Sequence, residues 1–236
     1  MDLPSSCAFQ TEQLFRKIVF SGVGLLNGAP MPIFIWIATF AWVFEMAAGF
    51  AVRAQDRSEL RPPAVFESIV DRDARSRALF TEASKAITSP RCVNCHPAGD
   101  HPLQGDEHRP HSPPVMRGGN GAGVPGNTCQ ACHTNRNFQI VGGKGSYQSI
   151  PGHPRWGLAP IEMAWEGKSI GQVCIQLKDP SRNGGRTLAL LHEHLAGDDL
   201  IAWGWNPGPG RNPAPGTQQR LGELIKAWID TGAQCP

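Results

Sequence analysis

The sequence predicts a mainly α-helical protein with long loops that are rich in glycine and proline. Four segments, at 66–88, 161–178, 186–205 and 217–232, have apolar residues at the spacings of three and four that are typical of amphipathic helices. Between the first two, residues 97–160 contain 12 glycines and 9 prolines in 64 positions. Few runs have the alternating pattern of a strand. Helices joined by long loops are therefore the expected architecture.

An export signal is predicted at the start of the chain, over residues 1–54. Residues 33–44 are almost purely apolar, and the small residues that follow end in Val52-x-Ala54. A short apolar stretch before small residues is typical of a secretory signal, here with cleavage after Ala54. The translation start is then either the first residue or Met31.

The alternative is an uncleaved membrane anchor over residues 33–52. Its length is close to the roughly 20 residues that span a bilayer, but it contains Glu45, and a carboxylate is costly inside a membrane. In both cases residues 55–236 are exported. We favour one compact unit for them, because neither half has enough apolar sequence to fold alone; the alternative is two small lobes that share the last helix. We expect the protein in the periplasm, with attachment to the inner membrane only if the anchor stays uncleaved.

The ends of the predicted helices coincide with residues that start or stop helices. Pro90 ends the first helix, and the second ends just before Pro180, because the residue before a proline disfavours the helical conformation. Gly197 interrupts the third helix. Thr217 caps the last helix, and Gly232 follows its final turn.

Two copies of the pattern Cys-x-x-Cys-His, at 92–96 and 129–133, carry the chemistry of the chain. A zinc site built from two Cys-x-x-Cys pairs usually has a gap of about 15–20 residues, whereas 33 residues separate Cys95 from Cys129 here. Zinc also requires no histidine directly after each pair. A thioredoxin-like motif would need a βαβ context, and the flanking segments are too rich in glycine and proline for one.

The same pattern is the attachment signature of a c-type haem. The two thiols bond covalently to the haem, and the adjacent histidine binds the iron from one side as the proximal ligand. We therefore predict two haem c groups in a cytochrome c-like fold, packed within one compact unit. Their attachment and proximal residues are, in chain order, Cys92, Cys95, His96, Cys129, Cys132 and His133. Haem attachment takes place outside the cytoplasm, in agreement with the predicted export signal.

Each haem iron has a second axial position for a distal ligand. For the first haem we favour His111, because its proline-rich segment could be held rigidly over the ring. For the second haem Met163 and His194 compete, and either ligand type is common. The alternatives are a core methionine at Met163 and a hydrogen-bonded surface histidine at His194. Four tryptophans are expected to pack against the porphyrins or to close the loops: Trp156, Trp165, Trp203 and Trp205.

Three cysteines lie outside the two motifs. Cys7 falls within the predicted export signal, Cys174 lies in the second predicted helix, and Cys235 follows the last helix. In an oxidising compartment we expect a disulfide between Cys174 and Cys235, and two buried free thiols are the alternative. The bridge would attach the C-terminus to the body of the protein.

Acidic and basic residues are nearly balanced in number. The chain has 22 lysines and arginines and 20 aspartates and glutamates, for a formal net charge of +2. Basic residues form no run of five or more, so the sequence argues against nucleic acid as a partner.

The chain resembles the dihaem c-type cytochromes in its two motifs, and it resembles a narrower group over nearly all of residues 60–236. The segments "PRCVNCHPAGDHPLQGD", "GHPRWGLAPIEMAWEGKSIGQVC" and "AWIDTGAQCP" are similar to those of small bacterial dihaem proteins known as isoquinoline 1-oxidoreductase subunits. The resemblance implies association with a molybdenum hydroxylase of the xanthine oxidase type. This chain shows no molybdopterin-binding domain, so it would be the haem subunit that takes electrons away.

Electron transfer is the function that we expect from these features. An exported dihaem c-type cytochrome would accept electrons from a partner dehydrogenase or hydroxylase and pass them to a downstream acceptor. The sequence contains no evident substrate pocket or acid–base pair, so catalysis is less favoured. The alternative function is a dihaem peroxidase-like or reductase enzyme, which would need a haem with an open distal site.

Overall fold

The computed structural model describes residues 59–141 and 147–236, so the predicted export signal lies outside the described residues. Every described residue belongs to one compact unit, Arg53–Pro236. This part is mainly helical, with six α-helices and three short two-stranded sheets, and it confirms the predicted fold class at this level. No helix in the described ranges is long and apolar enough to span a membrane.

The helices and 3-10 turns are distributed along the whole described part of the chain. In order they are η1 (Pro63–Phe66), α2 (Arg72–Ile87), α3 (Pro90–Val93), η2 (Cys129–Ala131), η4 (Ile161–Met163), α4 (Ile170–Lys178), η5 (Pro180–Arg182), α5 (Leu188–Gly197), α6 (Asp199–Ala202), η6 (Trp203–Trp205) and α7 (Gln218–Asp230).

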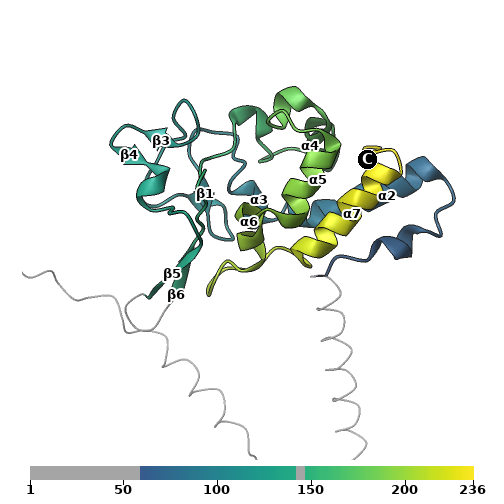
Figure 1. The fold of residues 1–236 in the computed structure, drawn as a ribbon, viewed down its shortest axis with the longest axis horizontal. Coiled ribbons are helices and arrows are strands. Elements are labelled where there is room, and N and C mark those ends of the chain that lie inside the picture. Colours follow the sequence, from purple (N-terminus) through teal and green to yellow (C-terminus); the bar gives the residue numbers. More distant parts are fainter. Residues whose placement is uncertain (1–58, 142–146) are drawn as a thin grey trace, which may run out of the picture. The chain divides into compact units, whose positions relative to one another are not determined.

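Three antiparallel hairpins organise the glycine- and proline-rich segment, for which the sequence predicts only loops. Their strands are β1 (Leu103–Gln104) with β2 (Arg109–Pro110), β3 (Gly123–Val124) with β4 (Asn127–Thr128), and β5 (Phe138–Val141) with β6 (Tyr147–Ile150). Figure 1 shows α2, α4, α5 and α7 on one side of this unit and the strands on the other, with α3 between them. The first Cys-x-x-Cys-His motif therefore lies where the helical part meets the looped part.

Capping side chains decide where two of the predicted helices begin or divide. The Asp71 side chain accepts a hydrogen bond from the backbone N–H of Ala74, so α2 begins after Asp71 rather than at the predicted Phe66. The Asp198 side chain accepts from the backbone N–H of Leu200 and thereby starts α6. The third predicted helix is accordingly divided at Asp198, one residue after the predicted break.

The second predicted helix is shorter than expected at its N-terminal end. Ser169 and Gln172 form a capping box that starts α4, with each side chain bonded to the backbone of the other residue. Residues 161–168 were included in the predicted helix, but they form η4 and a turn through Gly167, whose φ is 71°. This part of the chain lies against the first motif.

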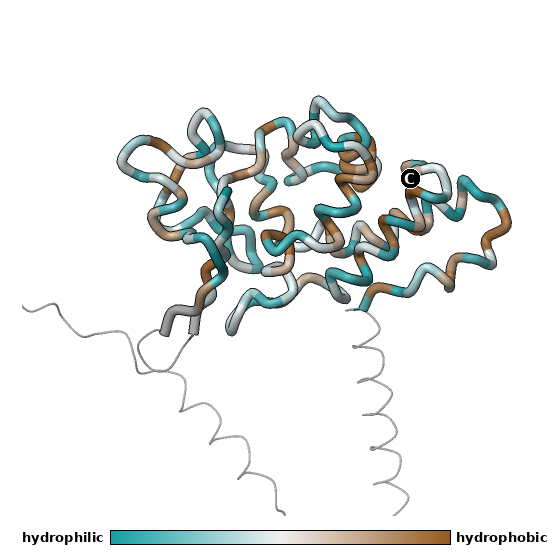
Figure 2. The backbone as a smooth tube through the Cα atoms, viewed as in Figure 1, coloured by the Kyte–Doolittle hydropathy of each residue, from teal (hydrophilic) through white to brown (hydrophobic). Residues whose placement is uncertain are grey.

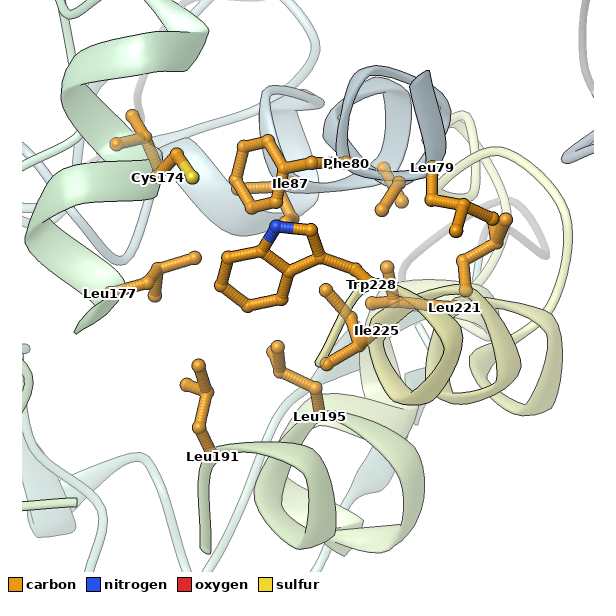
Figure 3. Packing of buried hydrophobic residues seen from close by; sticks show 14 of the residues in the cluster. Leu79, Phe80, Ile87, Cys174, Leu177, Leu191, Leu195, Leu221, Ile225 and Trp228 are labelled. Atoms are coloured by element: carbon orange, nitrogen blue, oxygen red, sulfur yellow. The ribbon is translucent and has the colours of Figure 1, made fainter. Parts of the chain in front are cut away.

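The hydrophobic core lies among α2, α4, α5 and α7. Trp228 is fully buried at its centre, and its ring lies 5.0 Å from that of Phe80. Figure 3 shows leucine and isoleucine side chains of the surrounding helices around this pair. The apolar residues are concentrated in this helical part, whereas the looped part is largely hydrophilic or neutral (Figure 2). The looped part therefore has no comparable apolar core made of its own side chains.

Helices α5 and α7 approach each other closely at a glycine. A Cβ atom added at Gly222 of α7 would lie 2.6 Å from the Cβ atom of Ala196 in α5. Real Cβ atoms do not come this close, so the helix separation observed here requires glycine at position 222.

A buried carboxylate attaches the segment before α2 to that helix. Glu82 is 1% exposed, and it accepts hydrogen bonds from the backbone N–H and Nε of Arg61 and from Nζ of Lys85. Burial raises the pKa of Glu82, but the bonds to Arg61 and Lys85 outweigh burial and lower this pKa below its ordinary value. Glu82 is therefore ionised at neutral pH and paired with two cations.

The disulfide predicted between Cys174 and Cys235 is present in the structure, and it joins α4 to the chain end. Two hydrogen bonds hold the same segment, from Nζ of Lys178 to the carbonyl of Ala233 and from the backbone N–H of Gln234 to Oγ of Ser76. The C-terminal residues are thus connected to both α4 and α2.

Candidate haem-binding site

The first motif is formed by α3 and the turn that follows it. Backbone N–H groups of Cys95 and His96 donate to the carbonyls of Cys92 and Val93, at 3.1 and 2.9 Å. The hydrogen bonds of this turn keep the two thiols and the imidazole close together along the chain. Val93 is buried, so the turn is anchored in the body of the protein.

The second motif has the same local form. It begins in η2, and the backbone N–H groups of Cys132 and His133 donate to the Cys129 carbonyl at 3.2 and 2.9 Å. The four motif cysteines are free thiols, in contrast to the bridged pair at the C-terminus. Within the described residues, no group of three or more His, Cys, Asp or Glu side chains is arranged to hold a metal ion.

The imidazole of His96 is fixed by a segment that lies far ahead in the chain. Its Nδ1 lies 2.7 Å from the carbonyl oxygen of Met163, and its ring stacks on Trp165 with centroids 3.7 Å apart and planes 3° apart. The backbone N–H groups of Trp165 and Glu166 donate to the His96 carbonyl at 2.8 and 3.2 Å. A carbonyl can only accept, so Nδ1 carries the proton and Nε2 keeps its lone pair.

The imidazole of His133 is fixed in the same way. Its Nδ1 lies 2.7 Å from the carbonyl oxygen of Pro151, and its ring stacks on Trp156 with centroids 4.3 Å apart and planes 7° apart. Gly152 makes this approach possible, because a Cβ there would collide with the Arg136 carbonyl. As in His96, Nδ1 of His133 therefore carries the proton, and Nε2 keeps its lone pair.

Both motif histidines are neutral at physiological pH. Burial lowers the pKa of His96 to about 4, although its bond to the Met163 carbonyl acts in the opposite direction. Burial lowers the pKa of His133 as well. Neutral imidazole is the form that binds metals.

The cysteines of the first motif lack the character of a redox-active dithiol. Burial raises the pKa of Cys92 to about 12 and that of Cys95 to about 11. Redox-active Cys-x-x-Cys pairs have a thiol with a lowered pKa, because the thiolate is the nucleophile. This pair therefore differs from a thioredoxin-like site in its electrostatics as well as in its surrounding fold.

A cavity of about 230 Å³ is bordered by residues of both motifs, among them Cys95, Cys132 and His133. Apolar side chains of the hairpins and loops close it: Leu103, Val115, Ile150, Trp156, Leu158 and Trp203. Its volume is below the roughly 300–1,000 Å³ of typical ligand pockets.

Each of the three candidate distal ligands lies beside a different motif from the one for which it was considered. His111, favoured for the first haem, borders the cavity, and its ring centre lies 6.1 Å from that of His133 in the second motif. Met163, considered for the second haem, bonds through its carbonyl to His96 of the first motif. His194 is also near the first motif, because its charge contributes to lowering the pKa of His96.

The environment of His194 orients its ring. Its Nδ1 lies 2.8 Å from Oδ2 of Asp198, and His153 approaches the same carboxylate at 3.9 Å. Burial lowers the pKa of His194, although the bond to Asp198 raises it.

Two buried arginines beside the first motif carry N–H groups without hydrogen-bond partners. Nη2 of Arg117 donates to the carbonyl of Pro97, directly after the motif, but its Nε and Nη1 have no partner, and Asp100 is 3.9 Å away. Nη2 of Arg91 pairs with Asp106 at 2.6 Å, and its Nε has no partner. Buried N–H groups left unpaired are costly, so these arginines suit an anionic group.

Two features of the site were not predicted from the sequence. Trp165 and Trp156 were expected to pack against the porphyrins or to close the loops, and in the structure they stack on the motif histidines. Arg117 was not selected at all, although a lone arginine in an otherwise glycine- and proline-rich loop was the available signal.

Comparison of the chain with protein-family models, curated proteins and solved structures found no match.

Proposed function

We propose that this chain is an exported dihaem c-type cytochrome that transfers electrons between redox partners in the periplasm. One observation carries the proposal: both Cys-x-x-Cys-His motifs hold their histidine in the same arrangement. In each, Nδ1 is bonded to a backbone carbonyl and the ring is stacked on a tryptophan. The two arrangements use unrelated segments of the chain, so local sequence similarity does not explain them.

This arrangement is the one that metal-ligating histidines usually have. A hydrogen bond from Nδ1 to a carbonyl fixes the tautomer and the ring orientation, and it raises the basicity of the ligating nitrogen. The stacked tryptophans restrict rotation of the rings. His96 and His133 are thereby prepared to donate Nε2 to an iron atom on the side away from the carbonyl.

The residues present fit two haem c groups. Cys92 and Cys95 would hold the first, and Cys129 and Cys132 the second, and the bound haem supplies a one-electron iron couple. The apolar cavity shields part of a porphyrin from water, and the unpaired N–H groups of Arg117 suit a propionate. This fit also explains why the looped part needs no larger apolar core of its own.

Electron transfer is supported by the proximity of the two attachment sites, since residues of both motifs border one cavity. Cys95 of the first motif and Cys132 of the second border it, so the two haems would lie next to each other. Adjacent haems allow an electron to enter at one ring edge and leave at another. By its resemblance to the isoquinoline 1-oxidoreductase subunits, the donor would be a periplasmic dehydrogenase or a molybdenum hydroxylase.

The proposal is tested by expressing the full chain in a host that attaches c-type haem in the periplasm. Pyridine haemochrome analysis should give two haems per chain, and the variants Cys92→Ala/Cys95→Ala and Cys129→Ala/Cys132→Ala should each give one. The reduced protein should then pass two electrons to a soluble cytochrome acceptor. A chain without covalent haem would refute the proposal, and sustained peroxide consumption would assign catalysis instead of electron transfer.

A further inference from the structure

His111 faces the second motif across the cavity that both border. The ring centres of His111 and His133 lie 6.1 Å apart, and their planes are inclined by 47°. Cys129 and Cys132 border the same cavity. The two imidazoles are therefore close neighbours and lie next to the second pair of thiols.

This separation is compatible with a single metal ion bound between the two imidazoles. A metal–imidazole bond is about 2 Å long, and the ring centre lies roughly 1 Å behind the bonded nitrogen. Two rings that bind one ion from opposite sides thus have centres about 6 Å apart. The observed 6.1 Å agrees with this value.

The second nitrogen of His111 is occupied as in the motif histidines. Its Nδ1 lies 2.8 Å from the carbonyl of Pro113, so Nε2 keeps its lone pair. The backbone of this segment is anchored on both sides, from the N–H of His111 to the Pro102 carbonyl and from Nδ2 of Asn127 to the Pro114 carbonyl. Asn127 belongs to β4, which leads directly into the second motif, so the imidazole and the motif are held together.

The other histidines of the same loop do not have this position. Nδ1 of His101 bonds to the Val115 carbonyl, and Nδ1 of His108 bonds to Oδ1 of Asn94. Neither ring borders the cavity.

We propose that His111 is the distal iron ligand of the haem attached at Cys129 and Cys132, opposite His133. This inference rests on the proposed function, because it requires a haem at the second motif. Coordination by two histidines makes that haem low-spin, closes its iron to carbon monoxide, and gives a lower reduction potential than histidine–methionine coordination.

The test uses the full chain with two substitutions in the loop. His111→Ala should leave the haem content at two per chain but convert one haem to a high-spin form that binds carbon monoxide, seen by electron paramagnetic resonance and by the reduced optical spectrum. Added imidazole should restore the low-spin spectrum. His101→Ala is the matched control, because it removes an imidazole that is likewise bonded to a carbonyl in the same loop, and it should change neither signal.

Single-haem backgrounds identify the haem concerned. His111→Ala should produce the high-spin signal in the Cys92→Ala/Cys95→Ala chain, which keeps the second haem, and should have no effect in the Cys129→Ala/Cys132→Ala chain. The reverse pattern, or a haem that stays low-spin and unreactive in His111→Ala, would overturn the inference. Absence of covalent haem from the unmodified chain would instead refute the proposed function.

A measurement without substitution covers the case in which a variant does not mature. Near-infrared magnetic circular dichroism of the unmodified oxidised protein distinguishes histidine–histidine from histidine–methionine coordination. At least one of the two haems should give the histidine–histidine band. A spectrum with only histidine–methionine or high-spin bands would contradict the role of His111.

Discussion

Removal of the Cys174–Cys235 disulfide should substantially destabilise the protein. The bridge joins residues 61 positions apart, so it closes a long loop in the unfolded chain. The chain-entropy relation for a loop of this length gives about 14 cal/mol/K, or about 4 kcal/mol at 25 °C. Cys174 is fully buried, so Cys174→Ala/Cys235→Ala also loses some packing, and the expected decrease in the free energy of unfolding is at least about 4 kcal/mol.

Urea unfolding followed by far-ultraviolet circular dichroism measures this decrease directly. In a thermal scan, each kcal/mol corresponds to roughly 2–4 °C for a domain of this size, so the midpoint should fall by about 8–16 °C. A reductant provides the matched control. It should destabilise the unmodified protein by a similar amount and leave the double variant unchanged.

A decrease below about 1 kcal/mol would refute this reasoning. It would mean that the hydrogen bonds of Lys178 and Gln234 hold the C-terminal segment without the bridge. A change in the slope of the urea transition would instead indicate that the reduced unfolded chain keeps residual structure.

Three further predictions concern helix packing, a buried ion pair and the site. Gly222→Ala should destabilise the protein by about 1–2 kcal/mol in urea unfolding, because its methyl group would overlap α5, whereas Gly197→Ala, with open space around it, should be neutral or slightly stabilising. Glu82→Gln should cost about 1–2 kcal/mol at pH 7, and this difference should shrink as the pH falls below the ordinary pKa of 4.5 and vanish only below the lowered pKa of the folded state, because the carboxylate stabilises the fold only while it is ionised. Arg117→Gln should lower the reduction potential of one haem, by on the order of tens of millivolts, since a buried cation favours the ferrous state; Arg77→Gln, on the exposed face of α2, should leave both potentials unchanged.

Each of these predictions has an outcome that contradicts it. A Gly222→Ala protein as stable as the Gly197→Ala protein would show that α5 and α7 can separate without cost. A Glu82→Gln difference that does not shrink as the pH is lowered would mean that packing, and not charge, is responsible. Equal shifts in the two arginine variants would show that Arg117 acts only through the net charge of the protein.

The helical part of the fold could largely be predicted from the sequence. The apolar face of α7, for example, repeats at helical spacing from Leu221 to Trp228, and a capping threonine precedes it. The prediction was wrong for residues 161–168, because Met163 and Trp165, which were assigned to a helix, contact His96 of the first motif instead. Spacing alone does not distinguish a residue that packs in the core from one that holds a ligand.

The sequence by itself determined the features whose information lies within a few neighbouring residues. The two Cys-x-x-Cys-His turns and the main helices belong to this class, since they depend on spacing and local hydrogen bonds. The pairing of Cys174 with Cys235 is long-range, and it could be predicted only because these two cysteines remained outside the motifs and the export signal.

Only the tertiary structure decided which groups surround the motif histidines. The hydrogen bond from His96 to Met163 spans 67 positions, and the stacking of Trp165 and the position of His111 opposite His133 likewise depend on how the looped segment returns to each motif. Contacts of this range leave no periodic signal, because they are set by glycine turns, hairpins and backbone hydrogen bonds that act together. The order of residues along the chain therefore favoured His111 for the first haem, whereas the folded chain places it beside the second motif.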